Sequence, residues 1–131
     1  MLGALLVGCG ASTHRAALRI SGEHGIGPAL SRADLRSAHA DFDPNTDQPI
    51  VVLELTPNGQ RMFARLTHAI VQAAKQHHRP FHILLSVNGK VISAPYIDYH
   101  LFPNGLSAKS GIVMDVPSKR VARDLAAKLN R

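Results

Sequence analysis

The sequence predicts an α+β fold, a two-layer sandwich close to a ferredoxin-like arrangement, in which two helices pack on a mainly antiparallel sheet. Three observations lead to this prediction: short β-rich runs at 49–55, 81–98 and 111–116, amphipathic helical segments at 57–78 and 119–131, and a two-residue turn inside the second run. Helices with one apolar stripe and sheets with one apolar face are buried by packing on each other. A chain of 131 residues, of which 45% are hydrophobic, suits one such domain.

The N-terminal third contains few periodic segments. Residues 10–30 are rich in Gly, Ser and Ala, so we expect a linker that becomes ordered towards its end. Residues 31–42 predict a short helix or helical turn, because Ser31 suits an N-cap and Leu35 and Ala38 share one side. Asp, Asn and Pro residues then predict a turn. The folded domain is expected to cover residues 31–131.

A strand followed by a long helix comes next. The run at residues 49–55 is short and rich in β-branched residues, which is typical of a strand. Thr56 suits an N-cap, and Pro57 suits the first helical position, where a missing N–H costs nothing. Apolar residues then recur at intervals of three and four, the pattern of one buried stripe: Met62, Phe63, Leu66, Ala69, Ile70, Ala73 and Ala74. Pro80 is expected to end the helix.

Residues 81–98 predict a β-hairpin. Two β-rich runs flank Asn88 and Gly89, and these residues suit a type I′ turn, in which both central positions have positive φ. Pro95 lies inside the second run, so this strand is expected to be an edge strand or to be broken there. Residues 111–116 predict a further strand. Ser118 is expected to cap the last helix, whose inner face would carry Val121, Ala122, Leu125 and Leu129.

The segment 91–102 is the candidate contact surface. It concentrates large apolar and aromatic side chains beside a strand that Pro95 marks as an edge, and an edge strand can bind an extended polypeptide through backbone hydrogen bonds. The candidate residues are Val91, Ser93, Pro95, Tyr96, Ile97, Tyr99, Leu101 and Phe102. The alternative is that these side chains cover the core beneath the helices.

The N-terminus offers two interpretations. Gly8 and Gly10 hint at a dinucleotide-binding loop, but Thr13 stands where the third glycine is required. Leu6 to Cys9 instead resembles the lipobox of bacterial lipoproteins, in which the cysteine thiol receives a lipid. We therefore expect a short signal over residues 1–9 and lipidation at Cys9, although no Lys or Arg precedes the apolar stretch. The alternative is an apolar N-terminus with an incidental cysteine.

An ordered series of short motifs runs through most of the chain. The series begins with Ala33, Asp34, Leu35, Ala38, Phe42 and Asp43, and continues with Leu55, Thr56, Gly59, Phe63 and Thr67. The hairpin contributes Asn88, Gly89, Lys90, Val91, Ser93, Ala94, Pro95 and Ile97. The last members are Gly105, Gly111, Ala122, Leu125, Ala126 and Leu129. This series resembles the head subdomain of the first extracytoplasmic domain of the protein-export membrane proteins SecD and SecDF.

The resemblance implies an extracytoplasmic, non-enzymatic binding module that assists protein export, with unfolded secretory polypeptides or Sec translocase components as partners. A lipid anchor would then replace the missing membrane helices. The alternative is a diverged cell-envelope binding domain with no export role. Asn88 stands where the family more usually has Asp, and Lys119 and Arg120 stand where Glu is usual.

Charge and motif content limit the other functions. The net charge of +6 favours anionic partners without selecting one. A ferredoxin-like domain that binds nucleic acid remains an alternative, but the predicted strands carry few aromatic residues for base stacking, so no nucleic-acid partner is expected. His77 and His78 are adjacent and point apart on a helix, so they suit a metal poorly. We expect no catalytic residues, no metal and no cofactor.

Overall fold

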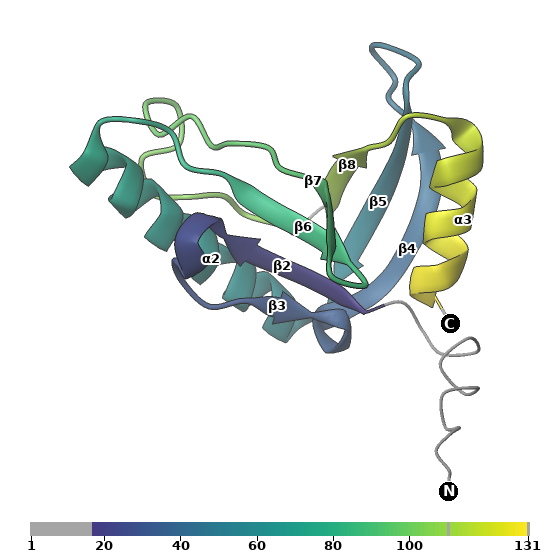
Figure 1. Ribbon diagram of the computed structural model, residues 1–131, viewed down its shortest axis with the longest axis horizontal. Coiled ribbons are helices and arrows are strands. Elements are labelled where there is room, and N and C mark those ends of the chain that lie inside the picture. Colours follow the sequence, from purple (N-terminus) through teal and green to yellow (C-terminus); the bar gives the residue numbers. More distant parts are fainter. Residues whose placement is uncertain (1–16, 110, 131) are drawn as a thin grey trace, which may run out of the picture.

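The computed structural model describes residues 17–109 and 111–130, which form two antiparallel sheets and two helices (Figure 1). In the four-stranded sheet the order is β3 (Leu30–Ser31), β2 (Leu18–Gly22), β6 (Ile83–Val87) and β7 (Lys90–Ser93). In the three-stranded sheet it is β4 (Leu35–Phe42), β5 (Pro49–Leu55) and β8 (Ile112–Asp115). The helices are α2 (Pro57–His77) and α3 (Lys119–Asn130), and the short 3₁₀ turns are η1 (Glu23–Gly25) and η2 (Arg32–Asp34). Within these ranges no helix has the length and apolar content needed to span a bilayer.

The predicted α+β class and antiparallel pairing are confirmed, but the strands form two sheets rather than one. Figure 1 shows α2 running along the four-stranded sheet, whereas α3 lies against the three-stranded sheet. Each helix thus covers the apolar face of its own sheet.

The linker predicted over residues 10–30 is wrong for its second half. Leu18–Gly22 is an internal strand that pairs with β6 from Leu18–Val87 to Gly22–Ile83, and Ile20 is completely buried. The partner strand lies more than 60 residues further along the chain, so local composition gives no sign of the pairing.

The short helix or helical turn predicted over residues 31–42 is correct for a turn at Arg32–Asp34 and wrong for the residues after it. Ser31 does cap a helical turn, η2, in which the Ser31 hydroxyl accepts from the Ala33 N–H and Asp34 accepts from the Ser31 N–H. The chain then continues as β4. A register shift between Leu35 and Ser37 adds one residue to the strand, so Leu35 and Ala38 lie buried at helix-like spacing although they belong to a strand.

The long helix agrees with its sequence signals. The Thr56 hydroxyl accepts from the Gly59 N–H at 3.0 Å, Pro57 occupies the first helical position, and the helix ends at His77. Its buried stripe includes Phe63, Leu66, Ile70, Val71 and Ala74.

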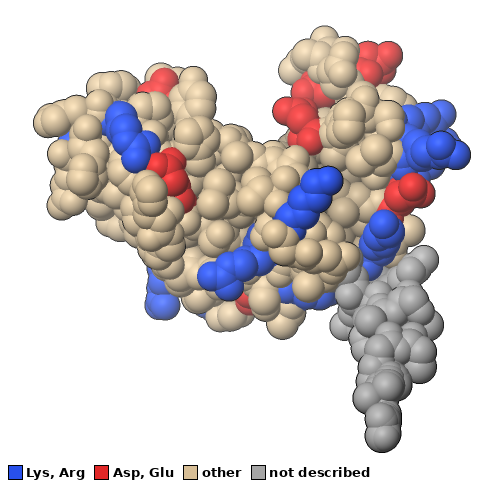
Figure 2. Space-filling view, viewed as in Figure 1, with Lys and Arg blue, Asp and Glu red and all other residues tan. Residues whose placement is uncertain are grey.

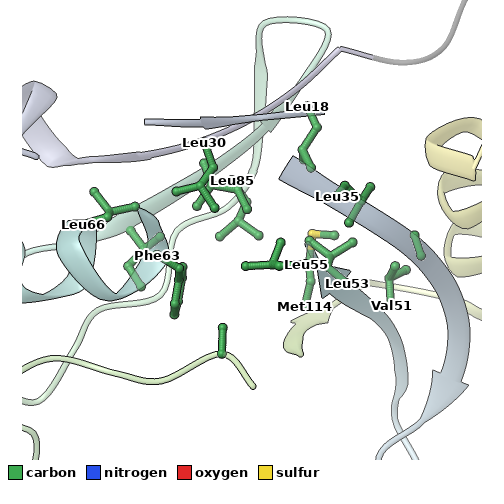
Figure 3. Close-up of a cluster of buried hydrophobic side chains, with 14 of the residues drawn as sticks. Leu18, Leu30, Leu35, Val51, Leu53, Leu55, Phe63, Leu66, Leu85 and Met114 are labelled. Carbon is green, nitrogen blue, oxygen red and sulfur yellow. The ribbon is translucent and has the colours of Figure 1, made fainter. Parts of the chain in front are cut away.

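One continuous core joins the two sheets (Figure 3). Leu18, Leu30 and Leu85 come from the four-stranded sheet, Phe63 and Leu66 from α2, and Leu53, Leu55 and Met114 from the three-stranded sheet. Helix α3 adds Ala122, Leu125 and Leu129, and the Ser118 hydroxyl accepts from the Val121 N–H as an N-cap. Val121, predicted on the inner face, is instead exposed.

Candidate polypeptide-binding surface

The β6–β7 hairpin has the turn that the sequence predicts. Asn88 has φ 54° and Gly89 has φ 81°, so both central residues adopt the left-handed region. Asn88 also secures the first described residue, because its backbone N–H donates to the Ala17 carbonyl and its Oδ1 accepts from the Ala17 N–H. The turn therefore links the hairpin to the strand β2 beside it.

Strand β7 is an edge strand, as Pro95 predicted. In a two-residue hairpin, the residues next to the turn exchange backbone hydrogen bonds, and here these are Val87 and Lys90. The next pair, Ser86 and Val91, is therefore the type without direct hydrogen bonds. It follows that the N–H and C=O of Val91 point away from β6, towards the open edge.

The edge strand ends just before Pro95, at Ser93. The Pro95 carbonyl accepts from the Ile83 N–H at 2.8 Å, and a single bridge pairs His82 with Tyr96. The chain therefore stays against the sheet as far as residue 97 although regular pairing has stopped.

Most predicted contact residues are accessible. The exposed fraction is 51% for Val91, 62% for Tyr96, 71% for Leu101 and 45% for Phe102. Pro95 is also exposed, and Ser93 and Tyr99 are half-buried. Ile97 is the exception: it is 4% exposed and belongs to the core, so its assignment as a contact residue is wrong.

Helix α2 holds the loop that carries Leu101 and Phe102. The Lys75 ammonium donates to the Pro103 carbonyl at 2.8 Å, and His68 Nδ1 lies 3.3 Å from the Asn104 carbonyl. Gly105 has φ 96°, and a Cβ at this position would lie 2.8 Å from the backbone nitrogen of His68. This close approach requires a glycine and fixes the loop beside the helix.

Sequence reasoning missed a charged cluster around Glu23. Its carboxylate accepts from Arg79 Nη2 at 2.7 Å, and it also contacts the His82 ring nitrogen at 2.8 Å and the His82 N–H at 3.1 Å. The hydrogen bonds from Arg79 and His82 lower the pKa of Glu23 to about 2. The Arg79 guanidinium also covers the Phe81 ring at 3.8 Å. Since His82 pairs with Tyr96, this cluster secures one end of the candidate surface.

A groove of about 450 Å³ separates the hairpin from α3. Ile92 and Lys90 line it from β7, and Val121, Leu125 and Lys128 line it from α3, whereas Val91 does not. The two faces of β7 thus border different surfaces.

Within residues 17–109 and 111–130, no group of three or more His, Cys, Asp or Glu residues could hold a metal ion. The predicted lipidation site, Cys9, lies outside the described residues.

The space-filling view shows a hollow and two regions of opposite charge (Figure 2). A hollow lies between the part of the molecule that contains α2 and the part that contains β4, β5 and α3. Acidic side chains gather where the three-stranded sheet borders this hollow, whereas basic side chains gather over α3. The candidate surface offers outward backbone N–H and C=O groups together with exposed apolar side chains.

Comparisons with known proteins bear on the family and the fold. The family model of the SecDF P1 head subdomain matches residues 21–131. A structure described as "Crystal structure of SecDF in Super-membrane-facing form" is similar with a TM-score of 0.66 and 21% identity, over 88% of this chain and 19% of that chain. A second, "Structure and function of a membrane component SecDF that enhances protein export", has a TM-score of 0.64 and 19% identity, over 98% and 70%. The chain thus spans about a fifth of the first structure. No curated protein matches the sequence.

Proposed function

The chain belongs to the SecDF P1 head subdomain family, and from this premise we propose that it is a non-enzymatic, extracytoplasmic module that binds extended polypeptides and assists protein export. Membership of this family supports the extracytoplasmic location and the link to protein export. The binding surface we assign is the open edge of β7 together with the following segment up to Phe102.

The observation that carries this proposal is the orientation of Val91. Its backbone N–H and C=O point away from β6 at the open edge of the sheet, so an extended chain can pair there as a further strand. Backbone pairing depends little on the partner's sequence, which suits a protein that meets many different unfolded chains. Exposed Tyr96, Leu101 and Phe102 supply apolar contacts along the same segment.

The export role rests on the similar structures. One of them is described as a membrane component that enhances protein export. We propose that this chain acts in the same setting, near the Sec translocase, and handles polypeptides as they emerge. Copurification of translocase subunits with the chain from solubilised membranes supports that role. Their absence favours a cell-envelope binding domain with no part in export.

We further propose that Cys9 carries a lipid that holds the domain at the membrane. Cys9 is the single cysteine, and it follows the lipobox-like residues Leu6 to Gly8. Two or more acyl chains hold a protein stably, whereas one chain binds only marginally. Cys9→Ser should therefore move the protein from the membrane fraction to the soluble fraction. Unchanged fractionation with no lipid mass on Cys9 contradicts this anchor.

Two substitutions at one position test the binding proposal. Val91→Pro removes the outward N–H and no hydrogen bond of the β6–β7 ladder, whereas Val91→Ala removes the side chain and keeps the N–H. Affinity for a reduced, unfolded secretory protein should fall about 3- to 10-fold in Val91→Pro, the effect of one lost hydrogen bond. Val91→Ala should weaken binding less. Equal affinity of Val91→Pro and the unmodified chain, with both folded, rules out strand addition at β7.

A further inference from the structure

A second open edge lies on the three-stranded sheet, at β8. The Val116 N–H donates to the Pro49 carbonyl at 3.3 Å, which marks these two residues as a hydrogen-bonded pair next to the end of the strand. Pair types alternate along an antiparallel ladder, so Met114 bonds to Val51, whereas Val113 and Asp115 do not bond to β5. The backbone N–H and C=O groups of Val113 and Asp115 therefore point away from β5, towards the open edge of the sheet.

On the opposite edge of this sheet, the chain itself caps the outward backbone groups of Ala38. The Ala38 N–H on β4 donates to Asn130 Oδ1 at 2.8 Å, and the Asn130 side-chain amide donates back to the Ala38 carbonyl. This amide at the end of α3 occupies the position that a further strand would take. Among the described residues, no such partner covers Val113 or Asp115, and the Val113 side chain is 57% exposed. Proteins usually protect an open edge unless it is used.

The charge beside β8 differs in sign from the rest of the protein. The whole chain has a net charge of +6, with nine acidic residues. Five of these nine lie on this sheet and its β4–β5 turn: Asp41, Asp43, Asp47, Glu54 and Asp115. The three strands and that turn contain one arginine, Arg36, and no lysine. Figure 2 shows acidic side chains along this part of the hollow.

The strand register places this charge on the face that continues across the open edge. His39, Val52 and Val113 lie in one row across the sheet, and Asp41, Ile50 and Asp115 lie in the next such row. Both rows point to the same side, because residues two apart on a strand share a face. A strand added beside β8 would extend these rows, with one side chain next to exposed Val113 and another next to exposed Asp115.

We propose that the β8 edge binds an extended polypeptide segment that carries lysine or arginine at alternate positions. Backbone groups of Val113 and Asp115 would pair with the segment, Asp115 would face one of its cations, and Val113 would contact the aliphatic part of another. This inference rests on the proposed function for the class of partner, an extended polypeptide. It adds a preference of the β8 edge for basic segments. It concerns a different strand from β7, so the two edges can be tested separately.

Two matched peptides test the selection for basic segments. One alternates lysine with valine, the other alternates glutamate with valine, and binding is followed by fluorescence anisotropy at low salt. The lysine peptide should bind the full chain at least several-fold more tightly, and added salt should reduce the difference, because exposed charges are screened. Equal binding of the two peptides overturns the inference.

Substitutions then locate the site. Val113→Pro removes an outward N–H and no hydrogen bond of the β5–β8 ladder, so it should weaken the lysine peptide about 3- to 10-fold. Val91→Pro should leave the difference in affinity between the two peptides unchanged, because backbone pairing at β7 depends little on the partner's sequence. Asp115→Lys adds no proline and should shift preference towards the glutamate peptide, which keeps the test decisive if Val113→Pro fails to fold. Weakening by Val91→Pro alone, with no change of preference in Asp115→Lys, rejects the β8 site and leaves the β7 proposal standing.

Discussion

The buried hydroxyl of Thr67 accepts a hydrogen bond from the Leu106 N–H at 2.9 Å, across 39 residues of sequence. Thr67 lies in α2 and is completely buried, and the same hydroxyl also lies 3.3 Å from the Leu106 carbonyl. Helix α2 therefore holds the returning part of the loop that presents Leu101 and Phe102. The candidate surface is thus supported from the domain interior rather than by its own exposed residues.

Thr67→Val should destabilise the domain. Valine has nearly the same shape but no hydroxyl, so the N–H of half-buried Leu106 loses its partner, at a cost of roughly 1–3 kcal/mol in the free energy of unfolding. Thr67→Ser keeps the hydroxyl. Hydrogen exchange at the Leu106 amide separates the two variants, since protection should fall in Thr67→Val and remain in Thr67→Ser. Similar protection in both would show that another group holds the loop.

Gly89→Val should lower stability by roughly 1–3 kcal/mol, because a β-branched residue is strained at positive φ. No atom would lie within 4 Å of a Cβ at this position, so the effect isolates backbone strain from steric contact. Asn88→Asp should be nearly neutral, since Asp tolerates the turn and can still accept from the Ala17 N–H. Urea unfolding measures both. Equal losses in the two variants would argue against this turn.

Glu23 should make stability depend on pH below about 4.5. Its pKa is lowered from 4.5 to about 2 in the folded protein by Arg79 and His82. A depressed carboxyl pKa stabilises the fold above the unfolded pKa, and this contribution is lost as pH falls from about 4.5 to about 2. The stability difference between the unmodified chain and Glu23→Gln should therefore shrink over this interval. A difference that stays constant with pH would contradict the assignment.

Asp47→Asn is the control for this pH series. Asp47 is exposed, and no hydrogen bond or ion pair of its side chain is found within the described residues. Its positive φ of 61° is also tolerated by asparagine. Its stability difference from the unmodified chain should stay small across the same pH range.

The buried and exposed residues of segment 91–102 should separate stability from binding. Ile97→Ala removes a core side chain and should cost about 2–5 kcal/mol. Leu101→Ala alters an exposed position and should change stability by no more than about 0.5 kcal/mol, while it weakens binding of unfolded polypeptide. Thermal unfolding and binding measured on the same preparations test this separation. A large loss of stability in Leu101→Ala would place Leu101 in the core.

Elements with strong local signals were predictable from sequence. Thr56 and Pro57 fix the start of α2 through a side-chain cap and a preset φ, and Asn88 and Gly89 fix the hairpin through their tolerance of positive φ. These effects act within a few residues. The edge position of β7 also followed locally, because Pro95 cannot donate in a ladder.

Features that depend on distant partners were not predictable. Strand β2 becomes internal by pairing with β6, and the division into two sheets likewise depends on long-range pairing. In β4, the register shift after Leu35 gave a strand the apolar spacing of a helix. Glu23 meets Arg79 and His82 from 56 and 59 residues away, so no local pattern could reveal their contact. The candidate surface was found in outline, but the burial of Ile97 was not.

The most direct test of the central claim maps backbone amide shifts while a reduced, unfolded secretory protein is titrated into the full chain. Strand addition at β7 predicts weak binding with shifts concentrated at Val91–Ser93 and at exposed Tyr96, Leu101 and Phe102, and modest sensitivity to salt. Val91→Pro should weaken the binding that the β7 shifts report by about 3- to 10-fold. No shifts within residues 91–102, or binding only to nucleic acid with a steep salt dependence, would contradict the account.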